Sequence, residues 1–551
     1  MGKPTVDYSL YLVTDSTPAI LGERNLVSVV EAALKGGVTL VQYRDKTSDT
    51  RVLVDTAREL HVVTKKYGVP LLINDRVDVA LAVGCEGVHI GQDDMDLPTA
   101  RKLLGDDKII GVSASTTQEA QKACDEGADY LGIGTIFSTS TYSISPPPSP
   151  QTTKKKNKLA DIPPSKSNTK NIIGTAGLRT ILSSLAQTHP TTPTVCIGGL
   201  HPHNIQRVLY QSATDGKAPD GVALVSAIVA AADPEAESRR LLELVRTPPA
   251  FVTRSAGAGE RVESVRVVLD LVGEVVGAVD GGNPLSHNMT NLVVQNFAAN
   301  VALAVGASPI MANYGEEAAD LAKLGGALVV NMGTVTPEAL VNYEKALRAY
   351  NLAGGPVVYD PVGAGATAVR RNAVKTIMGL GYLDIIKGNE GEILTVASLT
   401  APDSPQQQQQ QRGVDSSHKL SVAEKATLVS TLARRERNIV VCTGKTDVVS
   451  DGTRTFAVSN GHEMLGRVTG TGCVLGTTIS AFAAAYGGDR LVAVVAALVV
   501  FGIAGERAAE REGVVGPGGF VPAFLDELFR VRKETVAGDL EWLKRTKVEK
   551  L

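Results

Sequence analysis

Short apolar segments alternate with amphipathic helical patterns through the first 235 residues, and this alternation constrains the fold more than any other feature. Helical patterns such as those at 52–67 and 118–126 separate the apolar segments. Eight strand–helix units in a chain segment of this length are typical of a closed (β/α)8 barrel, the TIM barrel. The strands are expected at 9–14, 40–44, 71–74, 87–90, 109–112, 130–134, 194–197 and 222–225.

Polar or glycine-rich residues follow six of these predicted strands. Any one of them alone is more often a turn or a helix cap, but six together are hard to explain in that way. In a TIM barrel the chemistry lies at the carboxyl ends of the strands, so we expect these residues to surround one mouth. They occur at 42–46, 74–75, 89–94, 113, 198–199 and 226.

The types of residue at this mouth suggest a metal-bound diphosphate. Asp75 and Asp94 follow adjacent strands, and two carboxylates suit Mg²⁺, which keeps water or phosphate as its other ligands. No strong base or nucleophile is evident between them, which favours departure of a diphosphate over hydrolysis. Further diphosphate contacts are expected from Arg44, Lys46 and Asn74, and phosphate-binding backbone at 198–199 and 225–226.

The remainder of the chain, from about residue 262, begins with a helix and continues as a second α/β pattern. Strands are expected at 327–331, 357–359, 385–386 and 439–443, which predicts a mostly parallel sheet with helices on both faces. We interpret 283–291 as a polar turn before a helix, with His287 as a turn residue rather than a metal ligand. The stretch 520–547, which holds the lone Trp542, is expected to pack as an amphipathic helix.

A glycine-rich segment at 466–476 lies directly before an apolar helical run. It contains four glycines, two threonines and Cys473. Such a turn at a helix N-terminus offers unpaired backbone N–H groups to an anion, although an isolated string of this kind is more often only a tight turn. We expect Cys473 to lie where the backbone approaches a transferred group.

Composition limits the binding partners and the cellular compartment that can be expected for this chain. The 55 Lys and Arg nearly balance the 58 Asp and Glu, which argues against nucleic acid as a partner. The five cysteines form no C-x-x-C pair, so a reducing compartment is favoured over a zinc cluster or disulfides. The N-terminus lacks the apolar core of a secretory signal, and 492–504 is short for a membrane span. We therefore expect a cytoplasmic protein with no membrane association.

The predicted organisation has two domains, 1–235 and 262–551, joined by a linker at 236–261. Two segments read as disordered surface insertions. One, at 143–165, is rich in Ser, Pro and Lys, and the other, at 402–417, contains six consecutive glutamines.

The first domain resembles thiamine phosphate synthase over residues 8–232. The resemblance rests on YLVTD, VQYRDK, LLINDRVDVALAVGCEGVHIGQDD, GVSAST, GADYLGIGTIF and CIGGL. It implies that the pyrimidine diphosphate is held by Gln42, Tyr43, Arg44, Asp45, Lys46, Asn74 and Ser113. It also implies that Asp75 and Asp94 bind Mg²⁺, and that the thiazole phosphate is held by Thr139, Ser140, Thr141, Gly198, Gly199, Val225 and Ser226.

The chain departs from that family at one loop. The family has a Thr-x-Thr-Lys sequence whose lysine contacts the diphosphate, whereas here Thr141 is followed by Tyr142 and the insertion. When the loop is aligned from the far side of the insertion, Lys166 takes the place of the family lysine. Lys154 and Lys170 remain rivals for the same position.

The second domain resembles hydroxyethylthiazole kinase, a ribokinase-like family, over residues 262–535. The resemblance rests on NPLSHNMTN, GASPIM, DPVGAGA, KGNEGE, CTGK and GTGC. It implies thiazole alcohol contacts from Met311 and Gly470, ATP contacts from Arg370 and Thr443, and Mg²⁺ organised through water by Glu392. Cys473 stands where relatives place an Asp base. It could serve as a base only with a lowered pKa, and substrate positioning is the firmer expectation.

These resemblances predict a bifunctional enzyme in which the product of the second domain is the substrate of the first. The expected small molecules are ATP, the thiazole alcohol and its phosphate, and the pyrimidine diphosphate. The kinase resemblance also implies a homo-oligomer, a trimer or a multiple of it, with sites between subunits. Two alternatives remain, namely a thiazole kinase whose barrel is inactivated by its insertion, and a non-catalytic sensor of thiamine-pathway ligands.

Overall fold

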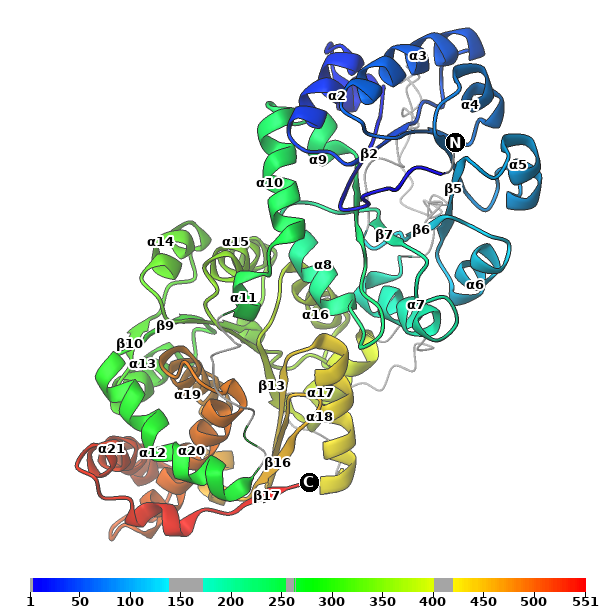
Figure 1. Cartoon of the computed structure of the whole chain (residues 1–551). Helices are drawn as coiled ribbons and strands as arrows, with labels where there is room; N and C mark the ends of the chain where they lie inside the picture. The colour runs from blue at the N-terminus through cyan, green and yellow to red at the C-terminus, as the bar shows by residue number, and fades with distance from the viewer. Residues whose placement is uncertain (1–2, 138–171, 254–261, 263, 401–419) are drawn as a thin grey trace, which may run out of the picture. The chain divides into compact units, whose positions relative to one another are not determined.

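The computed structural model describes residues 3–137, 172–253, 262, 264–400 and 420–551 (Figure 1). The chain divides into two compact units, Met1–Thr247 and Pro248–Leu551. The expected linker range, 236–261, contains most of helix α10 (Pro234–Arg246) in the first unit and helix α11 (Ala250–Thr253) in the second. Both expected insertions, at 143–165 and 402–417, lie outside the described residues.

The first unit is a closed barrel of eight parallel strands in sequential order, so the TIM barrel prediction is confirmed. Each observed strand agrees with its predicted position to within two residues. The strands are β1 (Leu10–Val13), β2 (Leu40–Tyr43), β3 (Leu71–Asn74), β4 (Gly87–Ile90), β5 (Ile109–Ala114), β6 (Tyr130–Ile133), β7 (Thr194–Ile197) and β8 (Gly221–Leu224).

Alternating side chains divide the barrel into an inner and an outer core, because successive strand residues point to opposite faces. On β1, Tyr11 belongs to the inner core, whereas Leu10 and Leu12 belong to the outer core beneath the helices. Between the strands run α1 (Pro18–Leu21), α2 (Leu26–Lys35), α3 (Thr50–Lys66), α4 (Val77–Val83), α5 (Leu97–Leu104), α6 (Thr117–Asp125), α7 (Gly174–Thr188) and α8 (Ile205–Ser212), and α9 (Ser226–Val229) follows β8.

The second unit is built on a nine-stranded sheet in the order β10-β9-β11-β12-β13-β14-β15-β16-β17. The pairs from β10 to β14 are parallel and the last three are antiparallel, so the mostly parallel sheet is confirmed. The strands are β9 (Leu285–Met289), β10 (Ser308–Ile310), β11 (Ala327–Asn331), β12 (Val357–Asp360), β13 (Ile385–Asn389), β14 (Ile439–Thr443), β15 (Asp447–Ser450), β16 (Thr455–Val458) and β17 (Val548–Lys550).

One prediction in this unit was wrong, because the segment interpreted as a polar turn forms the buried strand β9, with His287 inside it. The polar side chains on β9 form hydrogen bonds with residues distant in the sequence, which cannot be predicted from the sequence. Ser286 shares a hydrogen bond of 2.7 Å with Ser480, and a ring nitrogen of His287 pairs with the Ala312 carbonyl oxygen at 2.9 Å. A buried polar strand is tolerated when its groups are hydrogen-bonded in this way.

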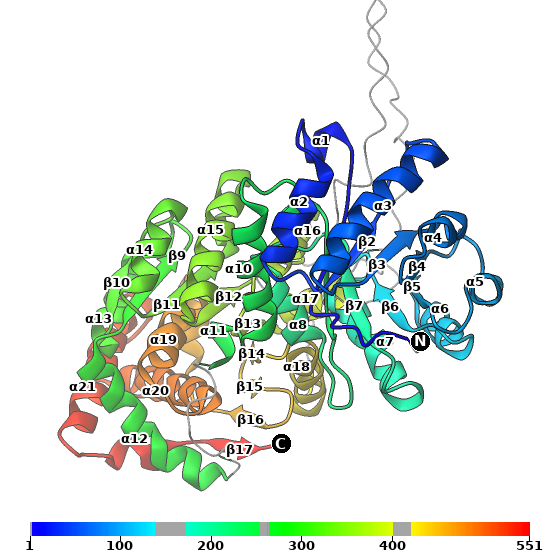
Figure 2. The ribbon, with the colours of Figure 1, turned by 45° about the horizontal axis from the view of Figure 1, so that its top comes forward.

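Helices cover both faces of this sheet and form two separate cores, visible as two helical layers in Figure 2. One layer contains α12 (Val265–Gly282), α13 (Gln295–Val305), α19 (Thr471–Ala485), α20 (Arg490–Glu510) and α21 (Pro517–Val536). The other contains α14 (Ala318–Lys323), α15 (Pro337–Ala353), α16 (Ala368–Leu380), α17 (Glu390–Leu399) and α18 (Val422–Glu436). Trp542, in the short helix Glu541–Arg545, packs in the first core.

Helix α20 is the one described helix long and apolar enough to cross a membrane. Within its most apolar 18-residue window, 89% is buried inside the unit. That burial is typical of the central helix of a folded core.

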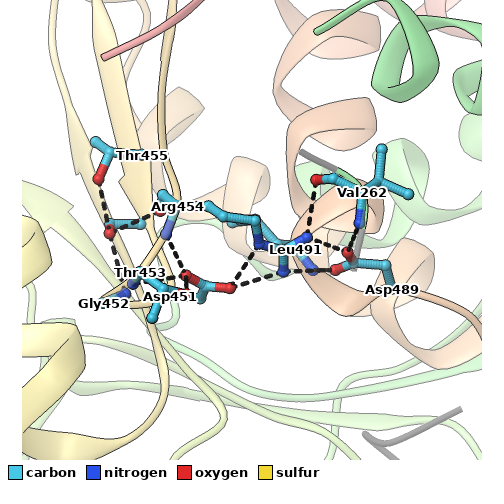
Figure 3. A network of polar contacts seen from close by, with 9 residues as sticks. Val262, Asp451, Gly452, Thr453, Arg454, Thr455, Asp489 and Leu491 are labelled. Carbon is cyan, nitrogen blue, oxygen red and sulfur yellow. Dashed lines mark hydrogen bonds and ion pairs between the residues drawn. The ribbon is translucent and has the colours of Figure 1, made fainter. Parts of the chain in front are cut away.

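An ion-pair network ties the start of α20 to a hairpin of the sheet (Figure 3). Arg454, in the turn between β15 and β16, pairs with Asp451 at 2.7 Å and also with Asp489, the N-cap residue of α20. The guanidinium also donates to the Val262 carbonyl oxygen at 3.0 Å. This one side chain therefore joins Val262 to the β15–β16 hairpin and to the central helix.

Candidate active sites

The mouth of the barrel contains a cavity of about 120 Å³. Its walls come from the carboxyl ends of several strands and the residues that follow them, as predicted for this fold. Among the residues expected from the sequence, the cavity is lined by Gln42, Arg44, Asn74, Ser113, Gly198, Gly199, Val225 and Ser226.

Three other residues expected at this site have different surroundings. The Tyr43 ring is buried in the outer core, on the far side of β2 from the inner core. The Asp45 carboxylate accepts hydrogen bonds from the backbone N–H groups of Thr47 and Ser48, at 2.9 and 3.1 Å, and so shapes its own loop. Lys46 is exposed. Thr139, Ser140, Thr141 and the lysines 154, 166 and 170 lie outside the described residues.

Asp75 and Asp94 follow the neighbouring strands β3 and β4, but neither lines the cavity, where the carboxylate in the wall is Asp15. Asp75 adopts a left-handed backbone conformation, with φ of 64°, and its N–H donates to the His89 carbonyl oxygen at 2.8 Å. Burial, followed by the negative charge of Asp94, raises the pKa of Asp75. Asp94 accepts a hydrogen bond of 2.7 Å from the Gly91 N–H. Two interacting carboxylates fit a divalent cation, which would relieve their repulsion.

The turn after β7 consists of two glycines in the left-handed region. Gly198 has φ of 87° and Gly199 has φ of 68°. A Cβ at either position would press on Thr135 or Phe137 as well. Residues without a side chain are therefore required here, and both glycines line the cavity.

A buried hydrogen-bond chain crosses the barrel interior, and sequence reasoning missed it. It runs from Gln42 through Tyr11, Tyr130 and His89 to Ser113, with distances of 2.6, 2.8, 2.7 and 2.9 Å. Burial lowers the pKa of His89 to about 4, so the ring is neutral at pH 7. Strand alternation could have placed these side chains inside the barrel, but not their mutual contacts.

In the second unit, the predicted glycine-rich segment forms the N-terminus of α19. Gly470 is the N-cap residue, with φ of 91° and without a side-chain cap, and a Cβ there would collide with Val294. Cys473 lies in the first turn of this helix, and the Asn291 amide contacts its Sγ at 3.6 Å. The orphan N–H groups of the first turn are the part of a helix suited to an anion.

The thiol of Cys473 does not have the character of a base. Burial, with the nearby charge of Asp360, raises its pKa to about 11. A helix N-terminus by itself favours a lowered thiol pKa, but burial outweighs that effect here, and the thiol is protonated at neutral pH. Substrate positioning remains the role that its location supports.

A buried ion pair lies beside Cys473. Lys387 contacts Asp360 at 3.1 Å and donates to the Gly472 carbonyl oxygen at 2.7 Å, at the start of α19. Asn331 donates to the other carboxylate oxygen of Asp360 at 2.9 Å. Both charged residues belong to motifs recognised in the sequence, but pairing between separate motifs is not visible there.

Glu392 is held by two backbone N–H groups. It is the third residue of α17 and forms a capping box with Asn389, whose N–H donates to it at 2.8 Å. The Gly363 N–H donates to the other carboxylate oxygen at 2.8 Å. Burial, with the charge of Asp360, raises the pKa of Glu392 to about 7. Two neighbouring buried carboxylates, Asp360 and Glu392, again fit a divalent cation.

The remaining predicted kinase residues border this region. The Arg370 guanidinium donates to the carbonyl oxygens of Met332, Gly333 and Val362, at 3.1, 2.7 and 2.7 Å, and so joins two loops. Thr443 donates to the Gly388 carbonyl oxygen at 3.2 Å. Met311 is partly buried against the core that contains α19.

Comparison with known proteins agrees with this geometry in both units. The model of the hydroxyethylthiazole kinase family matches residues 276–534, and that of thiamine monophosphate synthase matches residues 10–164. The chain is 41% identical to the probable thiamine biosynthetic bifunctional enzyme of Schizosaccharomyces pombe over 100% of this chain and 99% of the relative. It is 39% identical to the thiamine biosynthetic bifunctional enzyme of Saccharomyces cerevisiae over 97% of each chain.

The folds, sites and similarities together define a two-domain transferase that joins a synthase barrel to a ribokinase-like kinase. The chain belongs to the family of bifunctional thiamine biosynthetic enzymes, with a thiamine phosphate synthase domain followed by a hydroxyethylthiazole kinase domain. Its substrates are small molecules, and the kinase family implies ATP as a co-substrate.

Proposed function

We propose that the second unit transfers a phosphoryl group from ATP to the hydroxyl of 4-methyl-5-(2-hydroxyethyl)thiazole. The first unit then joins this thiazole phosphate to 4-amino-2-methyl-5-(diphosphooxymethyl)pyrimidine, which gives thiamine phosphate and diphosphate. The observation that carries the proposal is the presence of a separate polar site in each unit. The barrel cavity is lined by the glycine pair Gly198 and Gly199, and the α19 N-terminus has the Lys387–Asp360 pair beside it.

In the kinase unit, the first turn of α19 would bind the phosphoryl group through its N–H groups, and Lys387 would hold that turn in place. Met311, Gly470 and Cys473 would position the thiazole alcohol. Arg370 and Thr443 would contact ATP. Phosphoryl transfer depends mainly on positioning and charge stabilisation, so a protonated thiol is compatible with this role.

Mg²⁺ belongs to the proposal at both sites. Glu392 would hold it in the kinase unit, and Asp75 with Asp94 would hold it in the barrel. The supporting observation is the same in both places, since the pKa of Glu392 and that of Asp75 are raised by burial beside a second carboxylate. When bound, the cation would neutralise charge on the phosphates of the substrates.

In the barrel, the bond between the pyrimidine methylene carbon and the diphosphate oxygen breaks, and the thiazole nitrogen bonds to that carbon. Gln42, Arg44, Asn74 and Ser113 would hold the pyrimidine diphosphate, together with Lys46 and the backbone at Tyr43 and Asp45. Gly198, Gly199, Val225 and Ser226, with Thr139, Ser140 and Thr141, would hold the thiazole phosphate. Lys166 would contact the leaving diphosphate.

We also propose a cytoplasmic homo-oligomer, a trimer or a multiple of three. The support is the balanced charge of the chain, the scattered cysteines and the resemblance of the second unit to a trimeric kinase family. Size-exclusion chromatography with light scattering would measure the assembly directly.

The experiment that tests the function supplies ATP, Mg²⁺ and the thiazole alcohol, with and without the pyrimidine diphosphate. We expect thiazole phosphate in the first mixture and thiamine phosphate in the second. Thiazole phosphate with no thiamine phosphate, even when thiazole phosphate is supplied directly, would instead indicate an inactive barrel. Binding without turnover in either mixture would indicate a ligand sensor.

A further inference from the structure

The hydrogen-bond chain inside the barrel has the form of a directional relay. Tyr11, Gln42, His89 and Ser113 line the cavity, whereas Tyr130 is completely buried beneath it. Four of the five members therefore lie at the cavity wall, and only the central residue, Tyr130, is shielded from it.

The strands make room for this chain by omitting side chains. A Cβ on Gly111 would collide with the Tyr130 ring, and a Cβ on Gly132 would come within 3.0 Å of His89 Cε1. The two rings lie 5.6 Å apart between centroids. Glycine at both positions leaves room for the two rings to lie at hydrogen-bonding distance. Larger side chains at these positions would fill that space inside the barrel.

Donor and acceptor counting gives the chain one direction. The Gln42 amide nitrogen donates to the Tyr11 hydroxyl, which leaves the Tyr11 proton for Tyr130 and the Tyr130 proton for His89 Nδ1. A neutral imidazole has one donor and one acceptor, so His89 Nε2–H then donates to Ser113 Oγ. In the opposite direction the buried Tyr11 proton would point at the Gln42 amide protons, which is unfavourable.

We propose that Tyr11, Tyr130 and His89 are positioning residues that fix Ser113 as a hydrogen-bond donor toward the pyrimidine diphosphate. Because Ser113 Oγ accepts from His89, its own proton is directed to a partner other than the imidazole. The negative charge on a departing diphosphate is such a partner, and a donor already oriented toward it needs no reorganisation during bond cleavage. This inference rests on the proposed contact between Ser113 and that substrate.

The test breaks the chain at Tyr130, which does not reach the cavity. We expect Tyr130→Phe to lower synthase kcat/KM about tenfold and to leave kinase activity of the same chain unchanged. Tyr8→Phe is the matched control, because the Tyr8 ring lies 4.9 Å from the Tyr130 ring but its hydroxyl is not part of the chain. The control should keep wild-type synthase activity.

A double-mutant cycle separates the relay from a packing effect. In a Ser113→Ala background, Tyr130→Phe should change synthase kcat/KM by less than twofold, because the residue through which the relay acts is gone. A tenfold loss that persists in this background would overturn the proposal. Wild-type synthase activity in Ser113→Ala alone would show that Ser113 does not assist the diphosphate, and this would also overturn the proposal. A wild-type chain without synthase activity would instead refute the proposed function of the barrel.

The direction of the chain has its own spectroscopic readout. In ¹⁵N-histidine-labelled full-length protein, with His89→Gln used for assignment, we expect the His89 ring to carry its proton on Nε2. A proton on Nδ1 would reverse the relay and overturn the proposal. In Tyr130→Phe the strong preference for the Nε2–H form should be lost. The other histidine signals of the barrel should keep their wild-type shifts, which distinguishes this change from unfolding of the barrel.

Discussion

At the scale of single residues, burial determines the chemistry of both sites. The Cys473 thiol and the Glu392 carboxyl both have a raised pKa because the charged form loses hydration inside the fold. The same cause keeps His89 neutral. Burial therefore favours the uncharged form of each group, which can donate or accept hydrogen bonds. Only a charge brought by a substrate or a metal ion would shift the protonation of these groups.

The first prediction concerns Cys473. Because its pKa is raised to about 11, the thiol is protonated throughout the range from pH 6 to 9 and supplies no base there. We expect Cys473→Ala to lower kinase kcat by less than tenfold, to raise KM for the thiazole alcohol and to leave the shape of the pH–rate profile unchanged. Steady-state assays over that pH range measure all three quantities.

Cys124→Ser serves as the control, because this cysteine lies in the barrel and should not affect kinase activity. A loss of a hundredfold or more in kcat for Cys473→Ala, with the disappearance of a basic inflection in the profile, would identify the thiol as a general base after all.

At the scale of secondary-structure elements, buried ion pairs and caps decide how helices meet the sheet. Arg454 holds the N-terminus of α20 against the β15–β16 hairpin through two carboxylates that are themselves largely buried (Figure 3). Removing one partner of such a network leaves the others charged and without compensation, which costs more than the intact network contributes.

The second prediction is that Arg454→Met lowers the free energy of unfolding of the second unit by about 3–5 kcal/mol. The lone Trp542 is buried in this unit, so urea unfolding followed by tryptophan fluorescence reports it selectively. Lys323→Met is the control, because the Lys323–Asp320 pair is exposed and should contribute at most about 1 kcal/mol. Equal unfolding midpoints for the two variants would show that the Arg454 network is not stabilising.

At the scale of the whole molecule, the chain consists of two separately compact units. The second begins before its first long helix, because Phe251 of α11 is buried and stacks on Tyr382, with ring centroids 4.4 Å apart. A kinase domain cut at residue 262, as the sequence boundary suggests, would lose this contact.

The third prediction follows from that boundary. Fragments 1–247 and 248–551, expressed separately, should each fold and retain their own activity. Phe251→Ala in the second fragment should destabilise it by about 3 kcal/mol in urea unfolding, since a buried ring is replaced by a cavity. Phe529→Ala offers a control of the same chemistry, because Phe529 is about half exposed. An inactive or insoluble 1–247 fragment would show that the units depend on each other.

Much of the fold could be predicted because its signals are local. Every barrel strand is a short apolar run, and each of these runs is present in the structure close to its predicted position. Strand β9 was not predicted because Ser286, His287 and Asn288 are polar. Their side chains can be buried in a strand only because they form hydrogen bonds inside the fold. The hairpin strands β15 and β16 are short and were not anticipated either.

The sequence by itself determined the two α/β domains and the resemblance to two enzyme families, and it supplied the candidate residues of the two sites. Regular periodicity and contiguous motifs encode such properties, because each depends on residues close together in the chain. Only the tertiary structure decided that Lys387 pairs with Asp360, that the Cys473 thiol is not activated, and that a hydrogen-bond chain joins Gln42 to Ser113. These properties arise from burial and from contacts between distant residues, and their distances and desolvation exist only once the chain has folded.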